Sequence, residues 1–179
     1  MSHTKSVCNV GCTKAGACCH GNIVPVTDAD VRRLMQATGL PAAAIVRLYS
    51  VVDLDYDGER SWIRFSYGRR LLGLKKRGEA CRFLNQHGLC TVHNSRPMTC
   101  RTFPYMVYFN ANGRPEPLQR NTASGCCARV GPAWSRKQLL TDARQEDAED
   151  ARFFSQLRRW EKRGSRGGKR GLLRFLGLV

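Results

Sequence analysis

The chain has 179 residues, a formal net charge of +16 and nine cysteines. This length fits one domain of ordinary size, and an apolar fraction of 42% permits a hydrophobic core. No apolar run is long enough to span a bilayer, and the first residues lack the apolar region of a secretory signal. We therefore expect a cytoplasmic protein whose thiols stay reduced, and the odd cysteine count also argues against a secreted disulfide scaffold.

Residues 1–19 predict a loop that carries the first cysteine cluster, Cys8, Cys12, Cys18 and Cys19. Adjacent side chains of an extended chain point to opposite faces, so Cys18 and Cys19 can bind one ion only if the backbone turns there. Otherwise they serve two sites, or one binds and the other packs. His20 follows directly, but we leave it outside the expected ligand set.

Two helices are predicted next. Thr27 and Asp30 form a capping pattern for a first helix that would end at Gly39. Pro41 can open a second helix whose buried face would include Ile45, Leu48 and Tyr49.

A run rich in strand formers passes through Trp62, Phe65 and Tyr67, and Gly68 would end it. The basic residues between 69 and 77 either contact phosphate or form a solvated face.

The central segment 81–104 carries Cys81, Cys90 and Cys100. The turn residues 86–88 would place Cys81 and Cys90 on the two arms of a short hairpin. Pro97 can stand in the first turn of a short helix that Pro104 ends, with Cys100 facing the mouth of the hairpin. A strand from 105 to 109 and a turn at 112–113 follow.

The last third of the chain begins with a third cluster, Cys126 and Cys127. Ser135 and Gln138 predict the start of a long helix that Gly164 ends, interrupted by the acidic block 146–150. Its apolar face is expected to contain Leu139, Leu140, Ala143, Ala151, Phe154 and Leu157.

These elements predict a small α+β fold organised by metal. We expect a cysteine-cluster unit over 1–133, a long helix over 134–164 that packs on it or extends from it, and a flexible basic tail over 165–179. The tail, rich in arginine and leucine, is a candidate contact for nucleic acid, for an acidic protein or for an anionic membrane surface.

The three cysteine clusters are expected to converge on bound metal. Closed tetrahedral zinc sites use four ligands, and the common iron–sulfur clusters also use four thiolates. The spacings do not choose between zinc, iron and an iron–sulfur cluster. Arg82, Arg96 and Arg101 flank the central thiols, where they would offset thiolate charge, although Arg96 could equally pair with a carboxylate or cap a helix. The expected metal ligands are Cys8, Cys12, Cys18, Cys19, Cys81, Cys90, Cys100, Cys126 and Cys127.

Three stretches resemble the YkgJ-type cysteine-cluster family, also called CxxCxxCC, of zinc- or iron-chelating domains. They are the segment from Gly16 to Asp30, the block from Cys81 to Pro104, and Cys127 to Arg129. The resemblance covers about residues 8–131 and implies metal chelation. The family motif C-x-x-C-G-x-C-C aligns with a cysteine missing at Ala15, for which Cys8 is a candidate substitute.

Three hypotheses about function follow. The first is an accessory, non-catalytic metalloprotein that binds zinc or iron. The second is an iron–sulfur oxidoreductase or protein-modification enzyme. The third is a zinc-stabilised nucleic-acid-binding module that uses the basic C-terminus.

Overall fold

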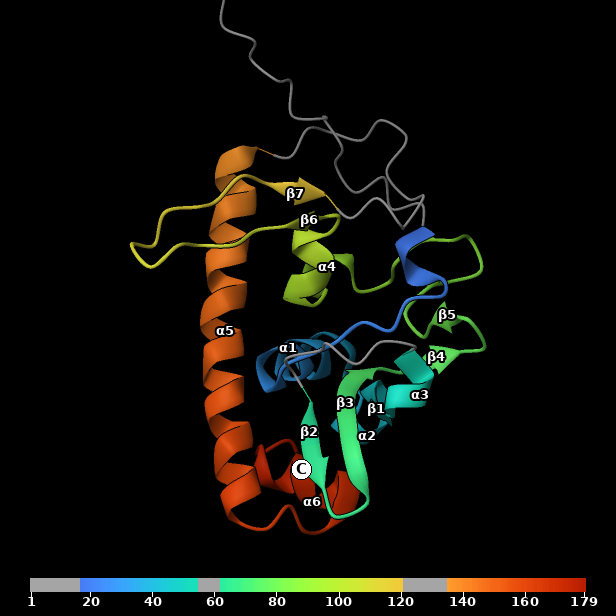
Figure 1. The fold of residues 1–179 in the computed structure, drawn as a ribbon. Helices are drawn as coiled ribbons and strands as arrows, with labels where there is room; N and C mark the ends of the chain where they lie inside the picture. The colour runs from blue at the N-terminus through green and yellow to red at the C-terminus, as the bar shows by residue number, and fades with distance from the viewer. Residues whose placement is uncertain (1–16, 55–61, 121–134) are drawn as a thin grey trace, which may run out of the picture.

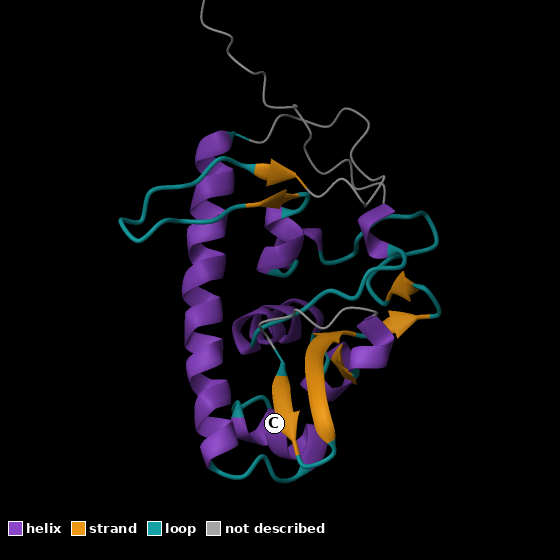
Figure 2. Cartoon of the chain, viewed as in Figure 1, coloured by secondary structure: helices purple, strands orange, loops and turns teal. Residues whose placement is uncertain are grey.

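The computed structural model describes residues 17–54, 62–120 and 135–179. Small antiparallel sheets and short helices lie along one long helix, α5, which runs the height of the molecule (Figures 1 and 2). The expected α+β class is confirmed. The elements are η1 (Ala17–Cys19), α1 (Asp28–Thr38), α2 (Ala42–Ile45), β1 (Val46–Tyr49), α3 (Val51–Leu54), β2 (Ile63–Phe65), β3 (Gly68–Leu74), β4 (Lys76–Arg77), β5 (Ala80–Cys81), η2 (His93–Ser95), α4 (Met98–Thr102), β6 (Tyr105–Met106), β7 (Gln119–Arg120), α5 (Arg136–Lys162) and α6 (Gly168–Phe175).

The predicted first helix is confirmed as α1, with both ends where the sequence placed them. Thr27 is the N-cap, and its hydroxyl accepts a hydrogen bond from the backbone N–H of Asp30 while the Asp30 carboxylate accepts one from the backbone N–H of Thr27. Such a cap contributes about 1 kcal/mol. Gly39 ends the helix with a left-handed φ of 68°, a conformation that glycine adopts without steric cost.

The predicted second helix is largely wrong. It ends at Ile45, and the next four residues form β1, which pairs antiparallel with β3 from Val46 opposite Leu74 to Tyr49 opposite Leu71. The run 46–49 has strand-forming side chains, and pairing with a buried neighbour decides its conformation over the helical spacing. β3 is the middle strand of the order β1-β3-β2. It was not predicted, because its residues overlap the basic stretch 69–77.

The long helix α5 is confirmed over 136–162, with the Ser135 hydroxyl accepting from the backbone N–H of Gln138 at 3.0 Å. Its buried face partly differs from the expected one, because Ala151 is exposed and the acidic Glu149 is buried. Apolar side chains on the same buried face are Leu139, Ala143, Phe153, Leu157 and Trp160.

A partly buried ion pair accounts for the acidic residue on this face. The guanidinium of Arg33 donates from Nη1 and Nη2 to the two carboxylate oxygens of Glu149, at 2.7 and 2.8 Å. The bidentate geometry joins α1 to α5 and offsets the cost of burying the carboxylate.

The segment 165–179 differs from the flexible tail expected of it. It contains α6, whose Leu172 and Leu173 are 0% and 2% exposed, and Leu176 and Leu178 are buried as well. Nothing in the sequence indicates what the apolar residues of this segment pack against. In the structure they belong to the same hydrophobic core as residues of α1, α2 and α5. The division into units 1–133, 134–164 and 165–179 stays a prediction.

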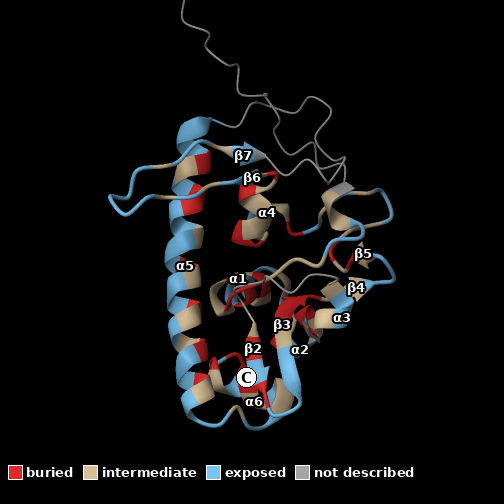
Figure 3. Ribbon diagram, in the orientation of Figure 1, coloured by how far each residue is buried: buried red, intermediate tan, exposed pale blue. Residues whose placement is uncertain are grey.

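Buried residues gather between α5 and the sheet and around α6 (Figure 3). Within the described ranges, no helix is long and apolar enough to cross a membrane.

Candidate metal centre

Five cysteines from three separate stretches of the chain line one cavity of about 220 Å³. Its walls are mostly apolar and come from the segment after η1, from β3, from the 81–93 hairpin region and from α4. The thiol-bearing residues on this cavity are Cys18, Cys19, Cys81, Cys90 and Cys100. The expected convergence of the first two clusters is therefore observed for these five residues.

Cys18 and Cys19 both reach the cavity because they lie in η1, a single turn of 3₁₀ helix. The backbone turns there, which meets the condition under which neighbouring cysteines can share one ion. His20 then forms an antiparallel bridge with Ala80, and Gly21 donates its N–H to the carbonyl of Glu79 at 3.0 Å. These contacts fix η1 beside β5, the strand that ends in Cys81.

The chain after η1 is held against β3. The N–H of Leu74 donates to the carbonyl of Val24 at 2.9 Å, and that of Val26 donates to Leu72 at 3.0 Å. Gly73 allows this approach, since a Cβ at that position would lie 3.1 Å from the side chains of Ile23 and Tyr49. A side chain there would push the Cys18–Cys19 segment away from the sheet.

The predicted hairpin between Cys81 and Cys90 is confirmed. Asn85 accepts backbone hydrogen bonds from His87 and Leu89 at its side-chain oxygen, both at 2.9 Å, and closes the turn. Leu84 and Cys90 face each other across an antiparallel bridge. The two arms thereby bring Cys81 and Cys90 to the same cavity.

Cys100 lies on α4, and the preceding loop is braced by two arginines. Arg96 donates from Nε to the carbonyl of Cys100 at 3.3 Å and from Nη1 to the carbonyl of His93 at 2.7 Å. Arg101 donates to the carbonyls of Arg96 and Asn94, at 3.2 and 2.8 Å. Arg96 therefore binds backbone carbonyls around α4, and it also lines the cavity.

Asp30 on α1 holds the start of α4 by a hydrogen bond. Its Oδ1 accepts a hydrogen bond from the backbone N–H of Met98, the first residue of α4, at 2.9 Å. Its Oδ2 accepts from the backbone N–H and the hydroxyl of Thr27, at 3.0 and 3.1 Å, and Oδ1 also pairs with Arg33. One carboxylate, 2% exposed, thus joins the start of α1 to the helix that carries Cys100.

The thiols influence one another electrostatically. Hydrogen bonds, first with Cys18 and then with Cys81, raise the pKa of Cys19. The hydrogen bond from the Cys19 thiol lowers the pKa of Cys81 to about 7, against the opposing effect of burial. Burial and then the negative charge of Cys18 and Cys81 raise the pKa of Cys100. Of Cys19, Cys81 and Cys100, Cys81 is therefore the most readily ionised, and thiolate is the form that binds metal.

The chemistry of this donor set suits a soft or borderline metal ion, since thiolates select zinc and iron–sulfur centres over magnesium or calcium. The geometry differs from a closed coordination shell: in the described ranges, no three His, Cys, Asp or Glu side chains are arranged to hold an ion directly. The residue types on the cavity fit a metal of this class.

Several expected ligands cannot be placed. Cys8, Cys12, Cys126 and Cys127 lie outside the described residues, as does Ala15. Among the described cysteines none forms a disulfide.

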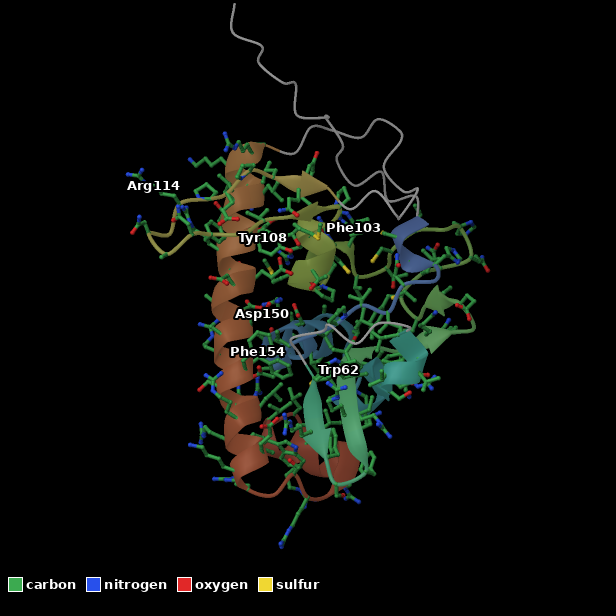
Figure 4. All side chains as sticks on the ribbon, viewed as in Figure 1. Trp62, Phe103, Tyr108, Arg114, Asp150 and Phe154 are labelled. Atoms are coloured by element: carbon green, nitrogen blue, oxygen red, sulfur yellow. The ribbon has the colours of Figure 1, made fainter. Side chains whose placement is uncertain are left out.

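Sequence reasoning missed two parts of the site. The apolar walls include Ile23, Val24 and Phe103, which occupy irregular segments where no periodic pattern marks them; Phe103 lies at the end of α4 (Figure 4). His93 also lines the cavity, and its position between Cys90 and Cys100 was the available signal.

Comparison with known proteins identifies a family. The family model CxxCxxCC, described as "Putative zinc- or iron-chelating domain", matches residues 11–128. No curated protein and no solved structure matches the chain. The family model covers most of the chain, including all five cysteines that line the cavity. The protein therefore belongs to the CxxCxxCC family.

Proposed function

We propose that the protein is an accessory metalloprotein that binds zinc or iron through Cys81, Cys90, Cys100 and at least one of Cys18 and Cys19. The observation that carries this proposal is the single cavity on which thiols from η1, the hairpin and α4 meet. Family membership supports metal binding independently. The remaining expected ligands, Cys8, Cys12, Cys126 and Cys127, would complete this site or form a second one.

The number of thiols favours a structural rather than a catalytic metal. Structural zinc sites close their shell with four protein ligands, whereas catalytic sites leave one position to water or substrate. Five thiols at one cavity are enough to close a tetrahedral shell. Such a metal would cross-link three stretches that the fold otherwise connects through backbone contacts, and its binding free energy would add to the free energy of folding.

An iron–sulfur cluster is the second candidate for this cavity. A volume of about 220 Å³ exceeds the space that one ion requires, and four of the thiolates would be enough for a common cluster. Its presence would support a redox or modification enzyme in place of an accessory role. The reduced thiols that either form needs agree with the expected cytoplasmic location, which stays a prediction.

Elemental analysis of protein purified without oxygen tests the proposal. We expect bound zinc or iron in the parent protein. The amount of metal per protein should be much lower in Cys81→Ser and Cys100→Ser. Thr99→Ser, on the same helix and the same cavity, is the matched control and should keep the metal. A brown protein with broad visible absorption and stoichiometric sulfide would indicate the cluster, and a colourless zinc-loaded one the simple ion.

A strong chelator supplies the second measurement. We expect it to lower the thermal midpoint of the parent protein and of Thr99→Ser, and to have little further effect on Cys100→Ser. Metal-free protein whose circular dichroism and thermal midpoint do not respond to added zinc or iron would exclude the proposal.

A further inference from the structure

Positive charge is concentrated at the end of the molecule that carries α6. Residues 62–70 and 158–174 contain eleven Lys and Arg residues and a single acidic residue, Glu161. We call this set the cationic end. Its members are Arg64, Arg69, Arg70, Arg158, Arg159, Lys162, Arg163, Arg166, Lys169, Arg170 and Arg174.

The fold brings these two stretches together. The indole N–H of Trp160 on α5 donates to the carbonyl of Arg64 on β2 at 3.2 Å, and the Trp160 ring lies edge-on to Phe65 at 5.8 Å. The same indole packs against Phe175 of α6 at 5.4 Å between ring centroids. The turn between β2 and β3, the last turns of α5 and α6 therefore share one end of the molecule, away from η1 and α4 (Figure 1).

Residues 158–174 contain a single carboxylate, Glu161. It pairs with Arg64 at 3.8 Å, and because the Arg64 side chain is 74% exposed this ion pair contributes little. Lys169 donates to the carbonyls of Ala43 and Val46, and the ring of Phe175 lies 5.3 Å from the Arg163 guanidinium. The exposed cations of residues 158–174 are Arg158, Arg159, Lys162, Arg163, Arg166, Arg170 and Arg174.

The composition of this surface separates the classes of partner. A membrane-surface helix needs an exposed apolar face, but Leu172, Leu173 and Leu176 are at most 2% exposed because they enter the core. Protein interfaces usually have an apolar centre, which a surface dominated by arginine and lysine lacks. Nucleic-acid interfaces are polar and strongly positive, and arginine suits the geometry of phosphate.

We propose that the cationic end binds the phosphate backbone of nucleic acid without reading its sequence. This inference does not depend on the metal site, which lies in the other half of the molecule. The sequence predicted that a flexible tail would present the basic residues. In the structure a folded helix and a hairpin present them.

Salt-dependent binding to a mixed-sequence duplex DNA, and separately to single-stranded RNA, tests the proposal on the full chain as purified. The variant Arg158→Gln/Lys162→Gln/Arg170→Gln removes three exposed charges and keeps good helix formers. The matched control is Arg114→Gln/Arg136→Gln/Lys137→Gln, which makes the same change in net charge at exposed positions elsewhere. Thermal midpoints of both variants verify that they are folded.

For duplex DNA, each neutralised phosphate contact contributes about −0.9 to the slope of log K against log salt concentration. If the three residues each contact a phosphate, the first variant should lose about 2.7 from that slope, and the control should keep the slope of the parent. Scrambled sequences should bind equally well.

Three results would overturn the proposal. One is the absence of salt-dependent binding to either nucleic acid at physiological salt. Another is an equal loss in both variants, which would make binding a property of net charge. The third is binding to vesicles rich in phosphatidylserine with no binding to nucleic acid, which would identify a membrane surface instead.

Discussion

Replacing Asp30 with asparagine should weaken both the fold and the metal site. The Asp30 carboxylate is 2% exposed and accepts hydrogen bonds from Thr27 and from the N–H of Met98, besides its pair with Arg33. Asparagine has the same shape, but its NH₂ group would face backbone N–H groups and a guanidinium, which are donors too. One or more of these buried groups would lose its acceptor.

The magnitude follows from the buried donors that lose their acceptor, since Arg33 keeps its bidentate pair with Glu149. Leaving a buried donor unsatisfied costs about 1–3 kcal/mol, a sizeable share of the roughly 5–15 kcal/mol that stabilises a typical domain. At about 2–4 °C per kcal/mol for a chain of this size, the thermal midpoint should fall by roughly 2–12 °C. Because Met98 opens the helix that carries Cys100, we also expect weaker metal binding in a competition assay with a coloured chelator.

The control is Asp28→Asn in the first turn of the same helix. Asp28 pairs with Arg32 at 3.7 Å, and the Arg32 side chain is 47% exposed, so this pair should contribute about 0–1 kcal/mol. Equal effects of the two substitutions on thermal midpoint and on metal affinity would refute the reasoning, since burial and the link to α4 are what distinguish them.

Further predictions concern α5 and α6. Burial raises the pKa of Glu146, so the folded state binds its proton more tightly than the unfolded chain, and this group's contribution to stability falls as pH rises from about 4.5 through the raised value. Glu146→Gln should therefore raise the thermal midpoint near neutral pH and leave it unchanged near pH 4, whereas an equal gain at both values would contradict the assignment. A Cβ on Gly171 would lie 2.6 Å from the backbone oxygen of Arg166, so Gly171→Ala should cost about 1–3 kcal/mol in denaturant unfolding, and an unchanged midpoint would show that α6 shifts freely. Ending the chain after Gly164 should unfold the protein, because each buried leucine of α6 contributes about 1.5–3 kcal/mol; circular dichroism would detect this, and a truncated protein with the parent's midpoint would contradict it.

Local signals in the sequence predicted elements whose ends are marked by specific chemistry. The capping pattern at Thr27 and Asp30, the glycine at 39 and the serine at 135 fix hydrogen bonds within a few residues, so α1 and α5 were found with their limits nearly correct. The turn before Cys90 was predicted for the same reason. The resemblance to the family was also readable from three stretches of cysteines and their neighbouring residues, since it depends on the order of residues and not on their positions in space.

Tertiary structure decided what local patterns leave open. The residues 46–49 became a strand because β3 offered a partner, and the leucines of α6 became core because α1, α2 and α5 covered them. The sequence supplied the thiols, but only the packing of η1 on β5 and of α4 on Asp30 brings Cys18, Cys19, Cys81, Cys90 and Cys100 to one cavity. Contacts between residues far apart in the chain depend on burial and on backbone pairing, and neither is encoded in the spacing of any single segment.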